Sequence, residues 1–251
     1  MTWNSVMGII SSAALFCPIL FIILLRLYSY STFPALLIYY SCSLIYNLMT
    51  EGYIGVSPGL VQYWGLVNNL LDTPLILLFL AHFSTSPAIS RRLRILLITF
   101  LLFEIGVVAG YGLNRTAITI ILGPGILVIF GLCVYFFIRQ AKLAIINQKA
   151  TGKALISASL LFAYGCFGMI YLMYYIMETP FVEDTFLVYF WVVTFSSLLL
   201  SAGLVVEQKR IRKLNELKTT RRELFSIYAN EKKAVPVRKT AMLDFDREQW
   251  N

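Results

Sequence analysis

Seven long apolar runs, separated by short polar segments, constrain the fold of this chain more than any other feature. They cover residues 7–25, 33–49, 61–83, 95–110, 117–138, 154–176 and 186–206. A helix needs about 20 mostly apolar residues to cross a bilayer, and the second and fourth runs fall slightly short of that length. Backbone groups in lipid must bond within their own helix. The pattern predicts an all-α integral membrane protein: a seven-transmembrane-helix bundle whose membrane domain comprises residues 1–206.

The composition excludes an ordinary soluble domain. Of the 251 residues, 59% are hydrophobic and only 14% are charged, with a mean hydropathy of +0.75. A soluble domain has about a quarter of its residues charged. We therefore expect a multi-pass protein of a cell membrane, either a plasma membrane or a bacterial inner membrane. The first run lacks a preceding basic segment, so we interpret it as a retained helix and not as a signal peptide.

The positions of the basic residues predict the orientation of the bundle. The chain has 21 Lys and Arg residues, and if all seven runs cross the membrane, every one except Arg115 lies on the same side. Basic loops and tails stay in the cytoplasm of most membrane proteins. The N-terminus is therefore predicted to lie outside and the C-terminus in the cytoplasm. A net charge of +8 is also found in proteins that bind nucleic acid. Here the basic residues gather on one side of the predicted membrane domain, so we expect no binding of nucleic acid.

Residues 207–251 form a basic cytoplasmic tail that begins with a predicted amphipathic helix. Leu214, Leu217, Leu224 and Tyr228 follow the spacing of a heptad repeat, which Arg221 interrupts. The repeat is too short to predict a coiled coil. A basic amphipathic helix next to a bilayer binds anionic lipid headgroups, and docking onto a cytoplasmic protein is the alternative. The sequence leaves the oligomeric state open.

Polar side chains in the third run mark the candidate functional site. A period of 3.6 residues places Gln62, Gly65, Asn69 and Asp72 on one stripe, flanked by Asn68 and Thr73. Ionisable groups inside a membrane are costly and usually face the bundle interior. The antiparallel fourth run has Glu104 near its middle, so Asp72 and Glu104 are predicted to lie at one depth. Two such carboxyls without a cation would share a proton, as in a proton relay or a cation site; interhelical hydrogen bonding is the structural alternative.

Aromatic residues in the sixth and seventh runs suggest a second part of this site. Tyr164, Tyr171 and Trp191 could line a pocket for a flat apolar ligand, and simple packing is the alternative. The single histidine and the four cysteines, all in apolar runs, do not have the spacing of a metal site or a disulfide framework. We therefore expect no metal and no cofactor.

Three prolines lie inside predicted spans, at positions 18, 74 and 124. Each removes a backbone donor, so a kink is expected at each position. The triplet Gly123-Pro124-Gly125 is predicted to be the place where a span breaks.

The stretch NNLLDTPLILL, residues 68–78, resembles the third helix of the microbial rhodopsins. Thr73, Pro74 and Leu75 match that family's second threonine, proline and following leucine. Asn68 stands where the family has its counter-ion Asp, and Asp72 where it has the first threonine. The resemblance covers about a dozen residues and implies a seven-helix fold. The family binds retinal through a lysine in its seventh helix; residues 186–206 contain no lysine, so covalently bound retinal is not expected.

Two functions remain open at this point. The first is a receptor-like or sensory protein that binds a small apolar ligand in the bundle and signals through the tail to a partner. The alternative is a proton- or cation-coupled transporter of small molecules that uses Asp72 and Glu104. The sequence shows no nucleophile–base arrangement or phosphate-transfer motif, so an enzyme is not expected.

Overall fold

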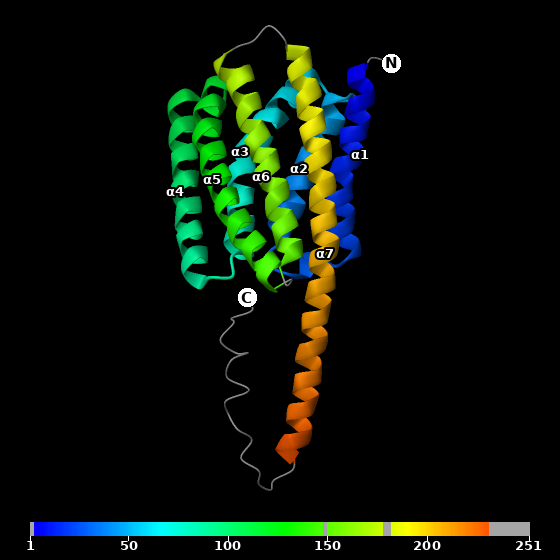
Figure 1. Ribbon diagram of the computed structural model, residues 1–251. Coiled ribbons are helices and arrows are strands. Elements are labelled where there is room, and N and C mark those ends of the chain that lie inside the picture. Colours follow the sequence, from blue (N-terminus) through cyan, green and yellow to red (C-terminus); the bar gives the residue numbers. More distant parts are fainter. Residues whose placement is uncertain (1–2, 148–149, 178–181, 231–251) are drawn as a thin grey trace.

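A computed structural model describes residues 3–147, 150–177 and 182–230, and this part of the chain is helical without strands. The elements are α1 (Trp3–Leu24), η1 (Leu27–Ser29), α2 (Pro34–Thr50), α3 (Pro58–Phe83), α4 (Pro87–Tyr111), α5 (Arg115–Asn147), α6 (Thr151–Tyr171), η2 (Leu172–Ile176) and α7 (Val182–Asn230). The seven α-helices lie side by side in one bundle, and α7 projects beyond it (Figure 1). We call the end from which α7 projects the tail end.

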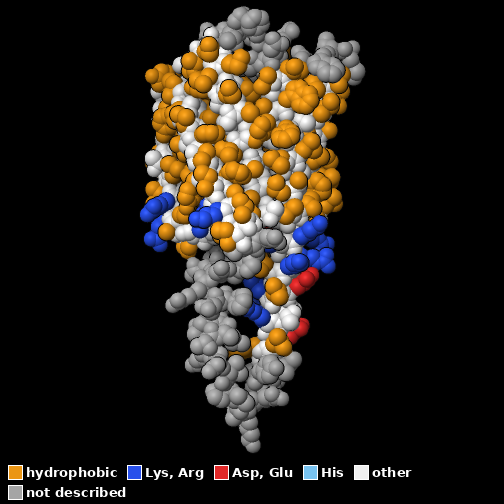
Figure 2. All heavy atoms as spheres, in the orientation of Figure 1, with side chains coloured by type: hydrophobic (Ala, Val, Ile, Leu, Met, Phe, Trp, Pro, Cys, Tyr) orange, Lys and Arg blue, Asp and Glu red, His pale blue; other side chains and the backbone are white. Residues whose placement is uncertain are grey.

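Six of these helices are long and apolar enough to cross a membrane, namely α1, α3, α4, α5, α6 and α7. Hydrophobic side chains cover the surface of the bundle, and Lys and Arg gather at its tail end (Figure 2). This surface suits a bilayer, so the chain is a multi-pass membrane protein. The second predicted span corresponds to α2, which has 17 residues and is shorter than the other six.

The packing order of the helices brings sequence-distant elements together. α1 packs against α2 and α7, α6 packs against α5 and α7, and α3 contacts α2, α4 and α5. α4 lies at the edge of the bundle (Figure 1) and is the least buried of the six long apolar helices. Most of the core lies between α1, α2, α3, α5, α6 and α7, and α4 adds Leu93 and Phe100 to it.

Proline and polar residues determine where several helices begin. Pro34, Pro58 and Pro87 occupy the first turns of α2, α3 and α4, where a missing N–H costs nothing and the fixed φ favours a helix. Asn114 precedes α5, and its Oδ1 accepts a hydrogen bond of 2.9 Å from the Ala117 amide. Residues at or next to each helix start therefore specify where the helix begins.

The predicted break at Gly123–Gly125 is wrong, because α5 continues through this triplet as one helix. Neighbouring side chains pack directly on the two glycines: Thr73 against Gly125 and Tyr171 against Gly123. The Tyr171 hydroxyl also donates a hydrogen bond of 2.8 Å to the Thr119 carbonyl, one turn before Pro124. Contacts from Thr73 of α3 and Tyr171 of α6 thus support α5 at the point where its own proline and glycines weaken the helix.

α7 is the longest helix, with 49 residues. It crosses the bundle and continues past residue 206 to Asn230 without interruption, so the predicted tail helix is the direct extension of the last span. Figure 1 shows it directed away from the bundle.

Candidate functional site

Asp72 lies near the middle of α3 and forms a hydrogen bond with α6. The Tyr164 hydroxyl donates to its Oδ1 over 2.9 Å. Tyr164 is almost fully buried and belongs to the main hydrophobic core. A buried carboxyl needs such donors because the apolar surroundings provide no water. The contact joins two helices whose residues are 92 positions apart in the sequence.

Three further tyrosines lie within electrostatic reach of the same carboxyl. Tyr39 and Tyr40 come from α2 and Tyr189 comes from α7, and the charge of Asp72 acts on each of them. Tyr39 also makes a polar contact with Asp72. We call Asp72 with Tyr39, Tyr40, Tyr164 and Tyr189 the tyrosine cluster. It draws on four helices, and the groups that act on Asp72 there are hydroxyls, with no cation among them.

Aromatic contacts fix the orientation of these rings. Tyr39 and Tyr40 meet edge to face with centroids 5.2 Å apart. Phe167 of α6 links Tyr164 on its own helix to Tyr189 of α7. Its ring centroid is 5.8 Å from that of Tyr164 and 5.9 Å from that of Tyr189. Such pairs contribute about 1 kcal/mol beyond simple burial. The hydroxyls around Asp72 are therefore held in place by ring packing.

Glu104 of α4 extends the polar site on one side of α3. Its side chain is 6% exposed, and its Oε1 has no hydrogen-bond partner among the described residues. The charge of Asp72 acts on it, so the structure brings the two carboxyls within electrostatic reach. Thr73 Oγ1 is also buried without a described partner. Unpaired buried acceptors are unusual and suit a site that receives a proton or a donor group.

Two other predicted site residues, Tyr171 and Trp191, lie apart from this cluster. Tyr171 bonds to the Thr119 carbonyl of α5. Trp191 is 57% exposed on the outside of the bundle, so its side chain does not line an interior site. Asn68 and Asn69 are half-buried, one turn before Asp72.

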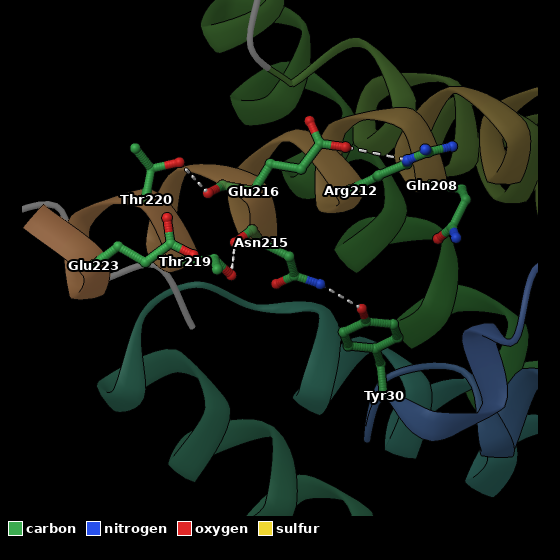
Figure 3. Close-up of a pocket in the computed structure, with 8 residues that line it drawn as sticks. All are labelled: Tyr30, Gln208, Arg212, Asn215, Glu216, Thr219, Thr220 and Glu223. Carbon is green, nitrogen blue, oxygen red and sulfur yellow. Dashed lines mark hydrogen bonds and ion pairs between the residues drawn. The ribbon is translucent and has the colours of Figure 1, made fainter.

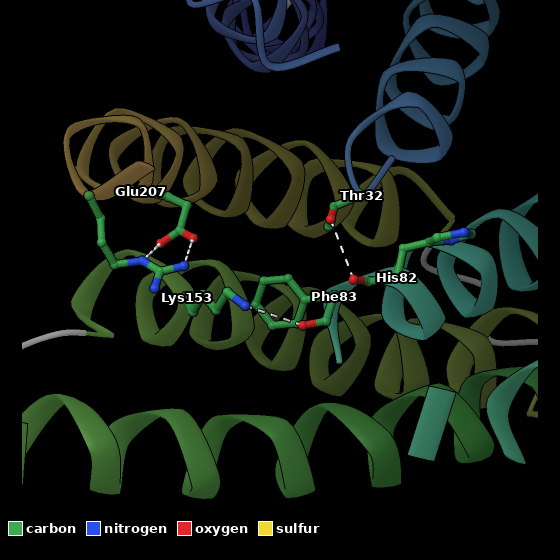
Figure 4. A network of polar contacts seen from close by, with 6 residues as sticks. Thr32, His82, Phe83, Lys153 and Glu207 are labelled. Atoms are coloured by element: carbon green, nitrogen blue, oxygen red, sulfur yellow. Dashed lines mark hydrogen bonds and ion pairs between the residues drawn. The ribbon is translucent and has the colours of Figure 1, made fainter. Parts of the chain in front are cut away.

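A second polar cluster lies at the tail end of the bundle (Figure 4). Glu207 of α7 is 2% exposed, and Arg210 donates to both of its carboxylate oxygens, with 3.0 Å from Nε to Oε2. Lys153 of α6 lies within reach of their charges, donates to the Phe83 carbonyl over 3.5 Å and lies 5.2 Å from the Phe83 ring centroid. We call Lys153, Glu207 and Arg210 the tail-end cluster. It connects the end of α3 to α6 and α7.

Beyond this cluster, a polar groove runs along α7 (Figure 3). Tyr30 closes one side, and its hydroxyl accepts a hydrogen bond of 3.0 Å from Asn215 Nδ2. The groove has a volume of about 540 Å³. Most of its lining belongs to one face of α7, so the opposite face of this helix is turned away from the bundle.

Sequence reasoning did not identify Tyr39, Tyr40 and Tyr189 as site residues. The pair Tyr39-Tyr40 in the middle of the second run was the available signal, since polar hydroxyls at that depth need partners. Lys153 and Glu207 were assigned to a loop and a tail, and no sequence pattern indicates that they meet.

The chain matches no protein-family model, no curated protein and no solved structure. Interpretation of its function therefore depends on its own residues.

Proposed function

We propose that this protein is a receptor-like, sensory membrane protein in which the tyrosine cluster detects a small ligand and α7 transmits the change. The observation that supports this most directly is the continuity of α7. Tyr189 of the cluster and the exposed helix that ends at Asn230 belong to the same unbroken helix. A helix moves largely as a unit, so a shift at Tyr189 displaces the tail.

The chemistry of the cluster suggests the class of ligand. Its aromatic rings pack within an apolar core, and its polar groups are one carboxyl and several hydroxyls. A ligand that is mainly apolar, with one hydrogen-bond donor or cationic group directed at Asp72, fits this combination. Glu104 and Thr73 provide further acceptors beside it.

The proposed orientation has the N-terminus outside and α7 ending in the cytoplasm, with α2 as a seventh, short span. The Lys and Arg residues at the tail end of the bundle support it through the positive-inside rule (Figure 2). The direction of α7, away from the bundle (Figure 1), favours a cytoplasmic protein over the lipid surface as partner of the tail. The resemblance of residues 68–78 to microbial rhodopsins agrees with a sensory bundle that lacks covalently bound retinal.

A specific observation favours the transporter as the second candidate. The charge of Asp72 acts on Glu104, and no cation among the described residues acts on either carboxyl. Transporters use such acids to bind and release protons or cations during the transport cycle.

Native mass spectrometry of the purified protein tests the sensory proposal. We expect a co-purified small molecule that is lost from Asp72→Asn and Tyr164→Phe variants. The control Trp191→Phe keeps it, because that side chain faces away from the cluster. Hydrogen exchange in residues 208–225 should then differ between the loaded and the stripped protein.

A liposome assay distinguishes the two candidates. Proton uptake that is driven by a pH gradient, persists when the chain is cut after Arg212 and disappears in Asp72→Asn would contradict the sensory proposal and support a transporter. A cut after Arg212 keeps Glu207 and Arg210 of the tail-end cluster. Absence of uptake, together with the ligand-dependent exchange in the tail, supports the sensor.

A further inference from the structure

The part of α7 beyond the bundle has two chemically different faces. One face lines the polar groove and includes both acids of this segment, Glu216 and Glu223. On a helix of 3.6 residues per turn, the opposite face carries an apolar stripe with basic neighbours. We call it the basic apolar face, and it consists of Leu214, Leu217, Leu224 and Phe225 with Lys213, Lys218 and Arg221.

Three of the four apolar residues of this face are open to solvent, and Leu214 is half-buried. Leu217 is 62% exposed, Leu224 47% and Phe225 71%. A contiguous apolar stripe bordered by charge is typical of an interaction surface. The segment 208–225 has seven Lys and Arg against two Glu, which gives a charge of 7 − 2 = +5. The stripe therefore suits an occupant that is both apolar and acidic.

Two other occupants fit the structure less well. In a parallel pair of α7 helices, Lys213 and Lys218 would face each other across the interface, and Arg221 would lie in its centre. Like charges at these positions disfavour a second copy. A membrane surface would require the helix to lie flat, whereas α7 leaves the bundle as a straight continuation of its last span (Figure 1).

The same chain contains a segment with the required chemistry. Residues 242–250 read MLDFDREQW, in which Leu243, Phe245 and Trp250 are apolar. Asp244, Asp246 and Glu248 against Arg247 give this segment a charge of 1 − 3 = −2. Apolar residues alternate with acids, so that one side can contact leucines while acids reach the flanking lysines.

The distance from α7 to this segment is short enough for contact within one chain. Leu217 and Leu224 lie about 20 Å and 9 Å before Asn230 along the helix, at about 1.5 Å per residue. The eleven residues between Asn230 and Met242 span at most about 40 Å when extended. A tether of this length raises the effective concentration of the segment to about the millimolar range.

We propose that residues 242–250 bind back onto the basic apolar face of α7 and cover the surface that is offered to a cytoplasmic partner. This inference goes beyond the proposed function, and the contact itself does not depend on it. Release of the segment would expose Leu217, Leu224 and Phe225 together.

Photo-crosslinking of the full-length protein in nanodiscs tests the contact. A benzophenone amino acid replaces Leu217 in one sample and Thr219, on the groove face, in the matched control. We expect crosslinks from position 217 to residues 242–250, and about tenfold fewer from position 219. The combined variant Asp244→Asn, Asp246→Asn, Glu248→Gln should lower the yield at position 217 by about tenfold, as expected for the loss of three exposed charge pairs. Glu216→Gln with Glu223→Gln should leave it unchanged.

Mixing isotopically heavy and light chains separates contacts within a chain from contacts between copies. Products that are all heavy or all light support the proposal. Mixed products would overturn it in favour of a second copy, and crosslinks to lipid would overturn it in favour of the membrane surface. Equal yields from positions 217 and 219, or no product with residues 242–250, would also overturn it.

Discussion

The tail-end cluster and the tyrosine cluster both hold a carboxyl inside the bundle, but they satisfy it in different ways. Glu207 is paired with Arg210, which donates to both of its oxygens. Asp72 receives the Tyr164 hydroxyl and other neutral groups, without a cation. An arginine partner keeps a carboxylate ionised and fixed in place, whereas neutral donors leave its charge open to change by a proton or a ligand. The comparison separates a carboxylate paired with a cation from one that is held by neutral donors.

The largest effect is expected where the tail-end cluster depends on close backbone contact. A Cβ added at Gly152 of α6 would lie 2.7 Å from the Glu207 Cα. Because backbone atoms cannot move aside without shifting α7, Gly152→Ala should destabilise the bundle by more than about 3 kcal/mol. Thermal unfolding in detergent measures this. Gly131→Ala is the control, since nothing lies within 4 Å of the new Cβ; equal unfolding temperatures for the two variants would contradict the close packing of α6 on α7.

Removing the charge of Glu207 should have the next largest effect. Glu207→Gln leaves Arg210 without its partner carboxylate and removes the negative charge that acts on Lys153, at a cost of about 2 kcal/mol. The matched control is Glu216→Gln, which breaks the exposed pair with Arg212 and should cost less than about 0.5 kcal/mol. Chemical denaturation of both variants tests the difference. If Glu207→Gln proved as mild as its control, the fastening role would be lost.

A smaller effect is expected in the tyrosine cluster. Tyr164→Phe removes the donor to Asp72 and should cost about 1 kcal/mol, the net value of one hydrogen bond. A double-mutant cycle with Asp72→Asn measures how much of this belongs to the pair. Tyr135→Phe, at a half-exposed position on α5, is the neutral control. A coupling energy near zero would show that Tyr164 contributes by packing alone.

The smallest effect concerns Glu51, which lies between α2 and α3, outside the spanning helices. Partial burial raises the pKa of its carboxyl, and its side chain packs over Gly8 of α1. A raised pKa in the folded state means that the folded protein binds the proton more tightly than the unfolded chain. Stability should therefore rise as the pH falls through that raised pKa toward the ordinary glutamate value. The gain is below about 0.5 kcal/mol because the group is largely solvated. Unfolding of the parent and of Glu51→Gln across this pH range measures it; a larger response in the variant would refute the assignment.

The depth of a residue in the membrane and the order of the helices were predictable from the sequence. The rotation of each helix about its axis and the contacts between side chains were not. Apolar run length placed Asp72 near the middle of a helix, and antiparallel order placed Glu104 beside it. The side of a neighbouring helix that meets Asp72 depends on packing, so Tyr39 and Tyr40 were missed and the exposed Trp191 was included. The predicted break at Gly123 failed for the same reason, because Thr73 and Tyr171 hold α5 from outside.

The prolines at the starts of α2, α3 and α4 have a consequence for biogenesis. Pro34, Pro58 and Pro87 define where three consecutive helices begin before any of them has a tertiary neighbour. During synthesis, the sequence of the emerging chain therefore already specifies where these helices begin as they insert into the bilayer. Moving Pro58 by a few residues would change where α3 begins, and would thus shift the depth of Asp72 relative to the tyrosines of its neighbours.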